Sequence, residues 1–282
     1  MTDSKLVSVI IPAYNEEEDI EKCLGSLTVQ TLKSIEIIVI DDGSTDNTQK
    51  KTTKFSVKFL QQNHKGPGVA RNLGAKRAKG KILVFVDADM TFDKNFIKDL
   101  VSPIIKGRTI GTFSKNEMNA NKENIWSKFW NINRGWPVDR LIPENYPPTA
   151  PVFRAILKSE FNRVGGFETG GEYTDDWSLS KKLGKKADLA KGAVYYHKNP
   201  ENVSEVWKQA RWIGKNKFIS GTNIRRFRSI IQYSFPISFI QGIFKTVAKA
   251  DLDTRFILFK IFYDFAVWVS VLKSFIKEEK YK

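Results

Sequence analysis

Four short apolar runs, separated by segments with a helical pattern, constrain the fold of this chain more than any other feature. The runs occupy residues 6–11, 35–40, 57–60 and 82–86. They are rich in β-branched and aromatic residues, which is typical of strands buried in a parallel sheet. Strands that alternate with helices in this order predict an α/β fold with a doubly wound, mostly parallel sheet flanked by helices.

The first strand is expected to end at Pro12, because proline removes a backbone donor. Asn15 is expected to cap the helix that follows, in which Ile20, Leu24 and Leu27 fall on one face. A nicotinamide-binding fold is not expected, because the turn after the first strand lacks the G-x-G-x-x-G pattern.

Two carboxylates follow the fourth run. Asp87 and Asp89 come directly after residues 82–86. In open α/β sheets, ligands bind at the carboxyl ends of the strands. Two acidic side chains one residue apart form an oxygen-rich site suited to Mg²⁺ or Mn²⁺ with a bound phosphate ester. The alternative is that one of them caps the helix that starts near Asp93.

Composition limits the class of protein. A hydrophobic fraction of 41%, with 12% aromatic residues, excludes a disordered chain. The one cysteine, Cys23, excludes a disulfide framework and suits a reducing compartment. The first residues carry no basic segment followed by an apolar one, so we expect no signal peptide and a cytoplasmic protein.

Positive charge is concentrated toward the C-terminus. The chain has a net charge of +15, and residues 198–282 hold 16 Lys and Arg against 7 Asp and Glu. Because these cations stand among Phe, Ile and Trp, we expect peripheral contact with an anionic membrane and no nucleic-acid partner. Ordinary solubility charge is the alternative.

Further motifs occur in order along the first 200 residues. They are VSVIIPAYNE at 7–16, VIDDGSTD at 39–46, GVARN at 68–72 and DAD at 87–89. Together they resemble the family 2 glycosyltransferases, which are inverting enzymes with the GT-A fold and a DXD-type metal site. The resemblance implies a nucleotide-diphosphate sugar donor, with a UDP-sugar favoured, and Mn²⁺ or Mg²⁺ as cofactor.

The resemblance also implies site residues. Tyr14 would lie beside the base and Asp42 would accept a hydrogen bond from it. Arg71 would approach the diphosphate, Asp87 the ribose and Asp89 the metal. The full implied nucleotide site is Pro12, Ala13, Tyr14, Glu16, Asp42, Arg71, Asp87, Ala88 and Asp89. Such a site supplies what a sugar nucleotide needs, namely a wall for the base, hydrogen-bond acceptors and a cation for the phosphates.

Two acidic residues and one histidine complete the expected site. Asp175 and Asp176 precede a helical pattern and resemble the family's Glu-Asp pair, with Asp175 where Glu is commoner. Inverting transfer needs a carboxylate to take the acceptor's proton. We expect Asp176 to do so and Asp175 to orient the acceptor; exchanged roles and helix capping are alternatives. His197 follows a strand expected over residues 193–196 and is implied to reach the metal or the diphosphate, unless it is purely structural.

We expect a catalytic domain over residues 1–220, with a nucleotide-binding half over 1–112 and an acceptor half over 113–220. Residues 205–220 are expected to form one basic helix. A basic, apolar helical tail follows over 221–282, in which Lys260 and Asp264 can pair on one helix face. Its apolar stretches, 230–244 and 256–272, are flanked by cations, which predicts helices in a membrane interface. Burial, dimerisation and a membrane span are alternatives.

The sequence therefore predicts an inverting, metal-dependent glycosyltransferase. The acceptor is expected at the cytoplasmic membrane face and is either lipid-linked or a saccharide, and the oligomeric state is open. The alternative is a basic protein that binds RNA or anionic lipid on an inactive transferase fold. A nucleotidyltransferase would need a glycine-rich phosphate loop after the first strand, and Pro12 to Asn15 do not form one.

Overall fold

The computed structural model describes residues 7–169 and 175–276, without the side chains of residues 175, 176, 217 and 218. The chain divides into two compact units. The first consists of Met1–Met118 and Ile142–His197, and the second of Asn119–Leu141 and Lys198–Lys282.

The first unit is built on an eight-stranded sheet. Its strand order is β3-β2-β1-β4-β9-β6-β10-β8. Strands β1 to β4 are parallel neighbours, which confirms the predicted parallel half of the sheet. Beyond β4 the pairing is mixed, because β9 is antiparallel to both β4 and β6. The strands are β1 (Val7–Ala13), β2 (Ile35–Asp41), β3 (Lys58–Gln61), β4 (Ile82–Phe85), β6 (Gly111–Phe113), β8 (Thr149–Ala150), β9 (Ala155–Leu157) and β10 (Ala187–Leu189).

The prediction that Pro12 ends the first strand was wrong, because β1 continues to Ala13. The carbonyl of Ile10 accepts a hydrogen bond from Val86, on the β4 side of β1. The backbone nitrogen of Pro12, two residues further on, faces the same side. Pro12 lies beyond Ile10, which is the last residue of β1 that pairs with β4. Its missing N–H therefore removes no hydrogen bond from the ladder.

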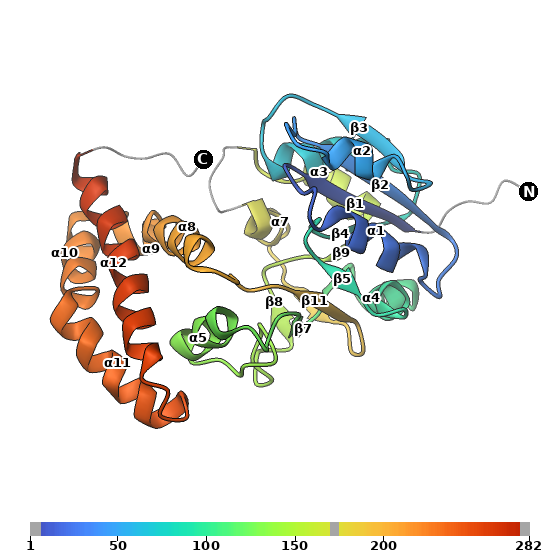
Figure 1. Cartoon of the computed structure of the whole chain (residues 1–282). Helices are drawn as coiled ribbons and strands as arrows, with labels where there is room; N and C mark the ends of the chain where they lie inside the picture. The colour runs from blue at the N-terminus through green and yellow to red at the C-terminus, as the bar shows by residue number, and fades with distance from the viewer. Residues whose placement is uncertain (1–6, 170–174, 277–282) are drawn as a thin grey trace, which may run out of the picture. The chain divides into compact units, whose positions relative to one another are not determined.

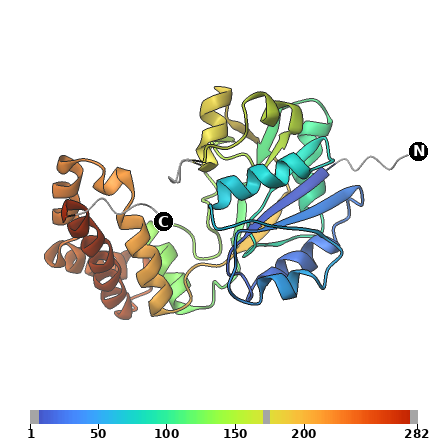
Figure 2. The ribbon, with the colours of Figure 1, turned by 90° about the horizontal axis from the view of Figure 1, so that it is seen from above.

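Helices cover both faces of this sheet (Figure 2). Residues alternate between the two faces, so Val9 and Ile11 pack on one side with α1 and α4, while Ile10 packs on the other with α3, α6 and α7. The helices of this unit are α1 (Ile20–Thr28), α2 (Thr48–Thr52), α3 (Pro67–Arg77), α4 (Phe96–Ile105), α6 (Lys158–Arg163) and α7 (Asp175–Leu183).

The predicted cap of α1 was also wrong. The helix begins at Ile20, with Asp19 at the capping position. Asn15 has a positive φ of 56° instead, and its side-chain oxygen accepts a hydrogen bond from the backbone of Thr45 at 2.8 Å. The backbone of Asn15 in turn donates to the Ser44 hydroxyl. Asn15 therefore joins the loops that follow β1 and β2.

A second, three-stranded sheet has the order β5-β11-β7. Its strands are β5 (Thr91–Phe92), β7 (Asn116–Asn119) and β11 (Val194–His197). Strand β11 is antiparallel to β5, and Phe92 lies opposite Tyr195. This sheet brings the end of β11 to the chain that leaves β4.

The second unit is helical. Its core joins Phe129 and Trp130 of α5 to Phe256, Phe259 and Tyr263 of α12. Figures 1 and 2 show α12 between α8 on one side and α10 and α11 on the other. The helices are α5 (Ile125–Arg134), α8 (Val203–Gly214), α9 (Lys217–Ser220), α10 (Asn223–Gln232), α11 (Phe235–Lys249) and α12 (Arg255–Ile276).

Two expectations for this region can be compared with the structure. The basic helix predicted over residues 205–220 is divided into α8 and α9 by Lys215 and Asn216. The pair of Lys260 and Asp264 is confirmed, and both side chains are buried. Among the residues described, no helix is long and apolar enough to cross a membrane.

Candidate active site

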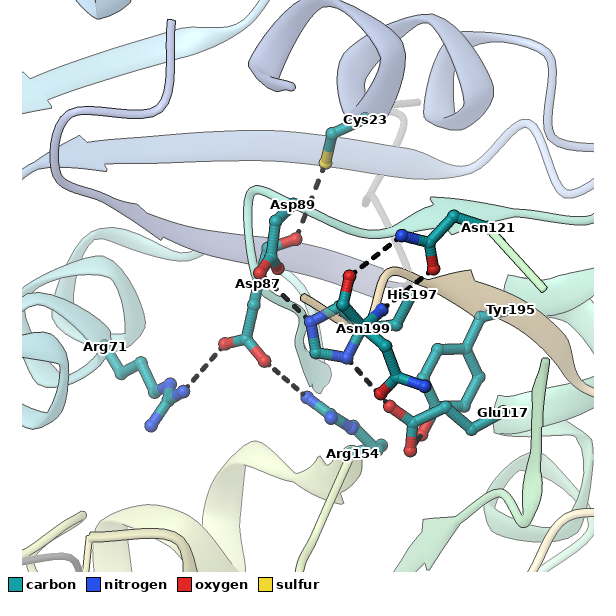
Figure 3. Close-up of polar contacts among 10 residues, drawn as sticks. All are labelled: Cys23, Arg71, Asp87, Asp89, Glu117, Asn121, Arg154, Tyr195, His197 and Asn199. Carbon is teal, nitrogen blue, oxygen red and sulfur yellow. Dashed lines mark hydrogen bonds and ion pairs between the residues drawn. The ribbon is translucent and has the colours of Figure 1, made fainter. Parts of the chain in front are cut away.

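Asp87 lies between two arginines just beyond the end of β4 (Figure 3). Its Oδ1 accepts a hydrogen bond from Arg71 Nη2 at 2.8 Å, and its Oδ2 accepts one from Arg154 Nη1 at 3.1 Å. Burial opposes ionisation, but the two guanidinium groups hold the pKa of Asp87 well below its usual range. Asp87 is therefore a fixed anion with an adjacent cation on each oxygen.

Asp89 contacts a chain of three further side chains (Figure 3). His197 Nε2 lies 3.0 Å from Asp89 Oδ2, and His197 Nδ1 lies 3.0 Å from Glu117 Oε1. The Tyr195 hydroxyl donates to Glu117 Oε2. Burial disfavours a charged imidazole, but the hydrogen bonds that its ring nitrogens donate to Asp89 and Glu117 raise the pKa of His197 to about 10. The histidine is thus an imidazolium held between two carboxylates.

The second oxygen of Asp89 fits a metal ion. Asp89 Oδ1 is buried and has no hydrogen-bond partner in the described part of the chain. A buried carboxylate oxygen without a partner is costly unless a cation binds it. Oxygen ligands of this kind suit Mg²⁺ and Mn²⁺. Among the side chains that the structure describes, which exclude those of Asp175 and Asp176, no group of three His, Cys, Asp or Glu could hold a metal by itself. A diphosphate could supply further ligands.

Glu16 lies among these acidic groups. Burial and the neighbouring Asp89, followed by Asp19, Asp87 and Asp46, raise the pKa of Glu16 to about 8. The carboxyl is consequently protonated at neutral pH. A cation bound at this edge of the sheet would favour its ionised form.

Asp42 holds the loop that leads into α3. Its Oδ1 accepts hydrogen bonds from the Gln62 side chain and from the backbone of Lys65, at 2.7 and 2.9 Å. Its Oδ2 accepts one from the backbone of Gly66 and lies 3.0 Å from His64 Nδ1. All four contacts position the segment between β3 and α3 at the carboxyl edge of the sheet.

Tyr14 and His64 form an aromatic pair over this loop. Their ring centroids are 4.0 Å apart, and the planes are tilted by 32°. Tyr14 is 42% exposed as a residue, so part of it remains accessible to a ligand. His64 was given no role from the sequence, and its ring is the partner that positions Tyr14.

The predicted catalytic pair begins α7. Asp175 and Asp176 are the first two residues of that helix, and their side chains lie outside the part of the chain that the structure describes. The other predicted site residues lie at the carboxyl ends of β1, β2 and β4, except that Arg71 comes from α3 and His197 from β11.

Comparison with known proteins gives the family. Residues 8–165, more than half of the chain, match the family model for glycosyl transferase family 2. The chain belongs to glycosyltransferase family 2. Glycosyltransferase GlyG from Streptococcus pneumoniae is 36% identical to it over 197 residues, which cover 63% of this chain and 65% of GlyG.

A second relative is UDP-Glc:alpha-D-GlcNAc-diphosphoundecaprenol beta-1,3-glucosyltransferase WfgD from Escherichia coli. It is 34% identical over 131 residues, or 45% of this glycosyltransferase and 51% of WfgD. The chain also matches three longer curated glycosyltransferases, from Streptococcus pneumoniae, Escherichia coli and Rickettsia conorii. The matched segments span only 16%, 27% and 17% of their respective lengths.

The GT-A fold is shown by solved structures. The mannosyltransferase PcManGT from Pyrobaculum calidifontis, in complex with GDP-Man and Mn²⁺, superposes with a TM-score of 0.58 at 20% identity. The superposition covers 94% of this glycosyltransferase and 86% of PcManGT.

Three residues of the glycosyltransferase site were not found from the sequence. Arg154 immediately precedes β9, and antiparallel pairing places the start of β9 beside the end of β4. Glu117 and Tyr195 meet through the small sheet, where Tyr195 and His197 share one face of β11. The alternation of Tyr195 and His197 was the one signal available in the sequence.

Proposed function

We propose that this glycosyltransferase transfers a sugar from a UDP-sugar, with inversion, to a lipid-linked acceptor at the cytoplasmic membrane face. The observation that carries the proposal is the edge of the sheet at which Asp87 and Asp89 lie with Arg71 and His197. Asp42 follows β2, which is separated from β4 only by β1. This edge offers the nucleotide an exposed tyrosine ring, carboxylate acceptors and cations within one short span.

The donor subsites follow from the contacts. Tyr14 would pack against the base, and Asp42 would accept its N–H in exchange for one of its present partners. Asp87 would accept a ribose hydroxyl, and Arg71, which already lies beside Asp87, would face the diphosphate. The UDP preference is supported by WfgD, whose name gives UDP-Glc as donor. PcManGT binds GDP-Man, so GDP is the competing nucleotide to test.

The same residues are suited to a divalent cation. Asp89 and His197 would hold Mn²⁺ or Mg²⁺, which neutralises charge that develops on the leaving diphosphate. The Mn²⁺ in the PcManGT complex supports this assignment. The partnerless Asp89 Oδ1 is the feature of this chain that favours it.

Asp176 would take the proton of the acceptor hydroxyl as it attacks the anomeric carbon, and Asp175 would orient the acceptor. Both begin α7, which packs on the same face of the sheet as α3. A lipid-linked acceptor is supported by WfgD, whose named acceptor carries a diphosphoundecaprenol. An acceptor of this kind has its sugar at a membrane surface.

An inactive fold that only binds RNA or lipid is not favoured. Such a protein has no use for a buried, partnerless carboxylate oxygen beside an ordered His197 and Glu117. The family match and the retained Asp42, Asp87 and Asp89 also favour an enzyme.

Nucleotide binding tests the proposal. Thermal melting would be followed with UDP or GDP, each with Mn²⁺, Mg²⁺ or EDTA. We expect UDP with a metal to raise the melting temperature of the wild type, since ligand at about 100 times its Kd stabilises by about 2.7 kcal/mol. The Asp89→Ala variant should lose the part of this rise in melting temperature that depends on the metal. If only GDP raised the melting temperature, the donor would be a GDP-sugar instead of a UDP-sugar. If neither nucleotide raised it, the proposal would be overturned.

A further inference from the structure

Helix α11 (Phe235–Lys249) has its large apolar side chains on the outside. Its buried residues are Ser238, Gly242 and Thr246. Its exposed apolar residues are Phe235, Phe239, Ile240, Ile243, Phe244 and Val247. Two of them, Phe244 at 73% and Val247 at 69%, are among the most exposed apolar side chains described. A helix on a water-facing surface has the opposite arrangement, with its large apolar residues buried and its polar residues exposed.

Packing against α12 explains the inward face. A Cβ built on Gly242 would lie 3.3 Å from Ile257 Cα, so the two helices approach closely at that point. The Ser238 hydroxyl donates to Asp264 Oδ2 at 2.7 Å. Small residues at every fourth position permit close helix contact, which is common where helices pack within lipid. Close packing against α12 therefore requires small residues on the buried face of α11, and the large apolar residues lie on its exposed face.

Helix α10 continues this surface along the chain. Ile224, Phe227 and Ile231 are more than half exposed and follow one another at helical spacing. We define the docking surface as the exposed apolar residues of α10 and α11 together. Nine exposed apolar residues on two consecutive helices are more than the single, scattered apolar residues of an ordinary surface, which indicates an interaction site.

The charge around this surface indicates its partner. Residues 221–250 contain no Asp or Glu and five cations, Arg225, Arg226, Arg228, Lys245 and Lys249. Arg228 and Lys249 are exposed. A second copy of the same surface would bring like charges together, whereas anionic headgroups complement them. Apolar side chains with adjacent Lys and Arg are the arrangement found in helices that lie in a membrane interface.

We propose that the docking surface of α10 and α11 binds the headgroup region of an anionic lipid bilayer, with Phe239, Ile240 and Phe244 inserted among the acyl chains. The proposed contact is peripheral, with the two helices lying in the interface. The surface contains none of the residues assigned to donor binding. The proposal therefore does not depend on the proposed transfer reaction.

Vesicle binding without any sugar nucleotide tests it. Cosedimentation would compare vesicles of phosphatidylcholine alone with vesicles that also contain phosphatidylglycerol. We expect the wild type to bind the anionic vesicles, and high salt to weaken binding by screening. The double variant Ile240→Glu/Phe244→Glu should lose about tenfold or more in affinity. Val29→Glu/Ile105→Glu is the matched control, because it places the same charges at exposed apolar positions of the first unit and should bind like the wild type.

A reporter that leaves the apolar residues intact gives a second measurement. Cys23 is buried, so an environment-sensitive dye on Ala248→Cys would report from α11 alone. We expect a blue shift with anionic vesicles, and none from the same dye on Val29→Cys. Equal binding by the double variant and the wild type would overturn the proposal. The proposal would also be overturned if the wild type were a dimer, the double variant were a monomer and neither protein bound vesicles. That result would assign the surface to a second copy of the chain.

Discussion

His197 Nε2 lies 3.0 Å from Asp89 Oδ2, although 108 residues separate the two in the chain. Glu117 holds the other ring nitrogen at the same distance. Both nitrogens therefore face carboxylates, and the imidazole is stabilised in its charged form. If Asp89 and His197 hold a divalent cation as proposed, that cation would replace the proton on His197 Nε2. Metal binding at Asp89 should consequently be linked to loss of the His197 proton.

The first prediction concerns this linkage. The pKa of His197 is raised to about 10 from an ordinary value of 6.5, so the apo protein keeps the proton at neutral pH. Affinity for Mn²⁺ should rise as the pH rises from about 6.5 toward 10, with a proton released on binding. Calorimetric titrations in buffers of different ionisation enthalpy measure that proton. His197→Gln should bind Mn²⁺ more weakly and release fewer protons, with Glu16 as the remaining source; an unchanged proton count in this variant would contradict the prediction.

The second prediction assigns Glu117 a positioning role. Glu117→Ala should reduce the affinity for Mn²⁺ by about 10 to 100 fold, the usual effect of removing a group that orients a metal-binding histidine. Because one counter-charge is lost, the pKa of His197 should also fall, so the pH above which the affinity for Mn²⁺ no longer rises should shift downward. Glu117→Gln keeps a hydrogen-bond partner and should retain more affinity than Glu117→Ala. If Glu117 were only structural, both variants would melt earlier and bind Mn²⁺ normally.

The third prediction is a pH dependence of stability in the apo protein. The folded pKa of Glu16, raised to about 8, lies above its ordinary value of 4.5. Between these values the folded state binds a proton that the unfolded chain lacks, so stability falls as the pH rises from about 5 to 8. Glu16→Gln should flatten this fall and be more stable than the wild type at pH 8 by about 1 kcal/mol, allowing for solvent screening. At pH 5 the two proteins should melt together, as calorimetry can show.

Much of this site could be predicted because it depends on strand ends. Asp42, Asp87 and Asp89 follow buried apolar runs, and parallel strands place their carboxyl ends on one edge. Local patterns are sufficient for such an inference. Arg154 could not be placed in this way, since its position depends on the antiparallel pairing of β9 with β4. That pairing has no signature in either segment alone.

Some residues have a type that fits more than one structural role, so the sequence alone did not determine which role they take. Asn15 is a good helix cap by residue type, yet its side chain bonds to Thr45 in the neighbouring loop. Trp130 stands in the half of the chain assigned to the acceptor, and it is buried against Tyr263 in the helical unit. In both cases a contact distant in sequence decided the outcome, and residue type alone carried no information about that contact.

The fourth prediction tests the buried pair of the helical unit. Lys260 Nζ lies 2.8 and 2.6 Å from the two oxygens of Asp264. Lys260→Met should destabilise this unit by about 3 kcal/mol, because it leaves Asp264 buried without its cation. Lys260→Met/Asp264→Leu should recover most of the loss, since no charge then remains buried. Urea denaturation followed by tryptophan fluorescence is suitable, as six of the seven tryptophans belong to this unit. Equal losses in the single and double variants would contradict the argument.

The fifth prediction separates the two acids that begin α7. If Asp176 is the general base, Asp176→Asn should lower kcat by about 100 to 10,000 fold, the usual contribution of such a group. Thermal stabilisation by UDP and metal should remain, because donor contacts are assigned to other residues. Asp175→Asn should instead raise the KM for the acceptor. An acceptor that attacks through a phosphate is already ionised and needs no base, so a small effect of Asp176→Asn together with full transfer activity would identify that class of acceptor.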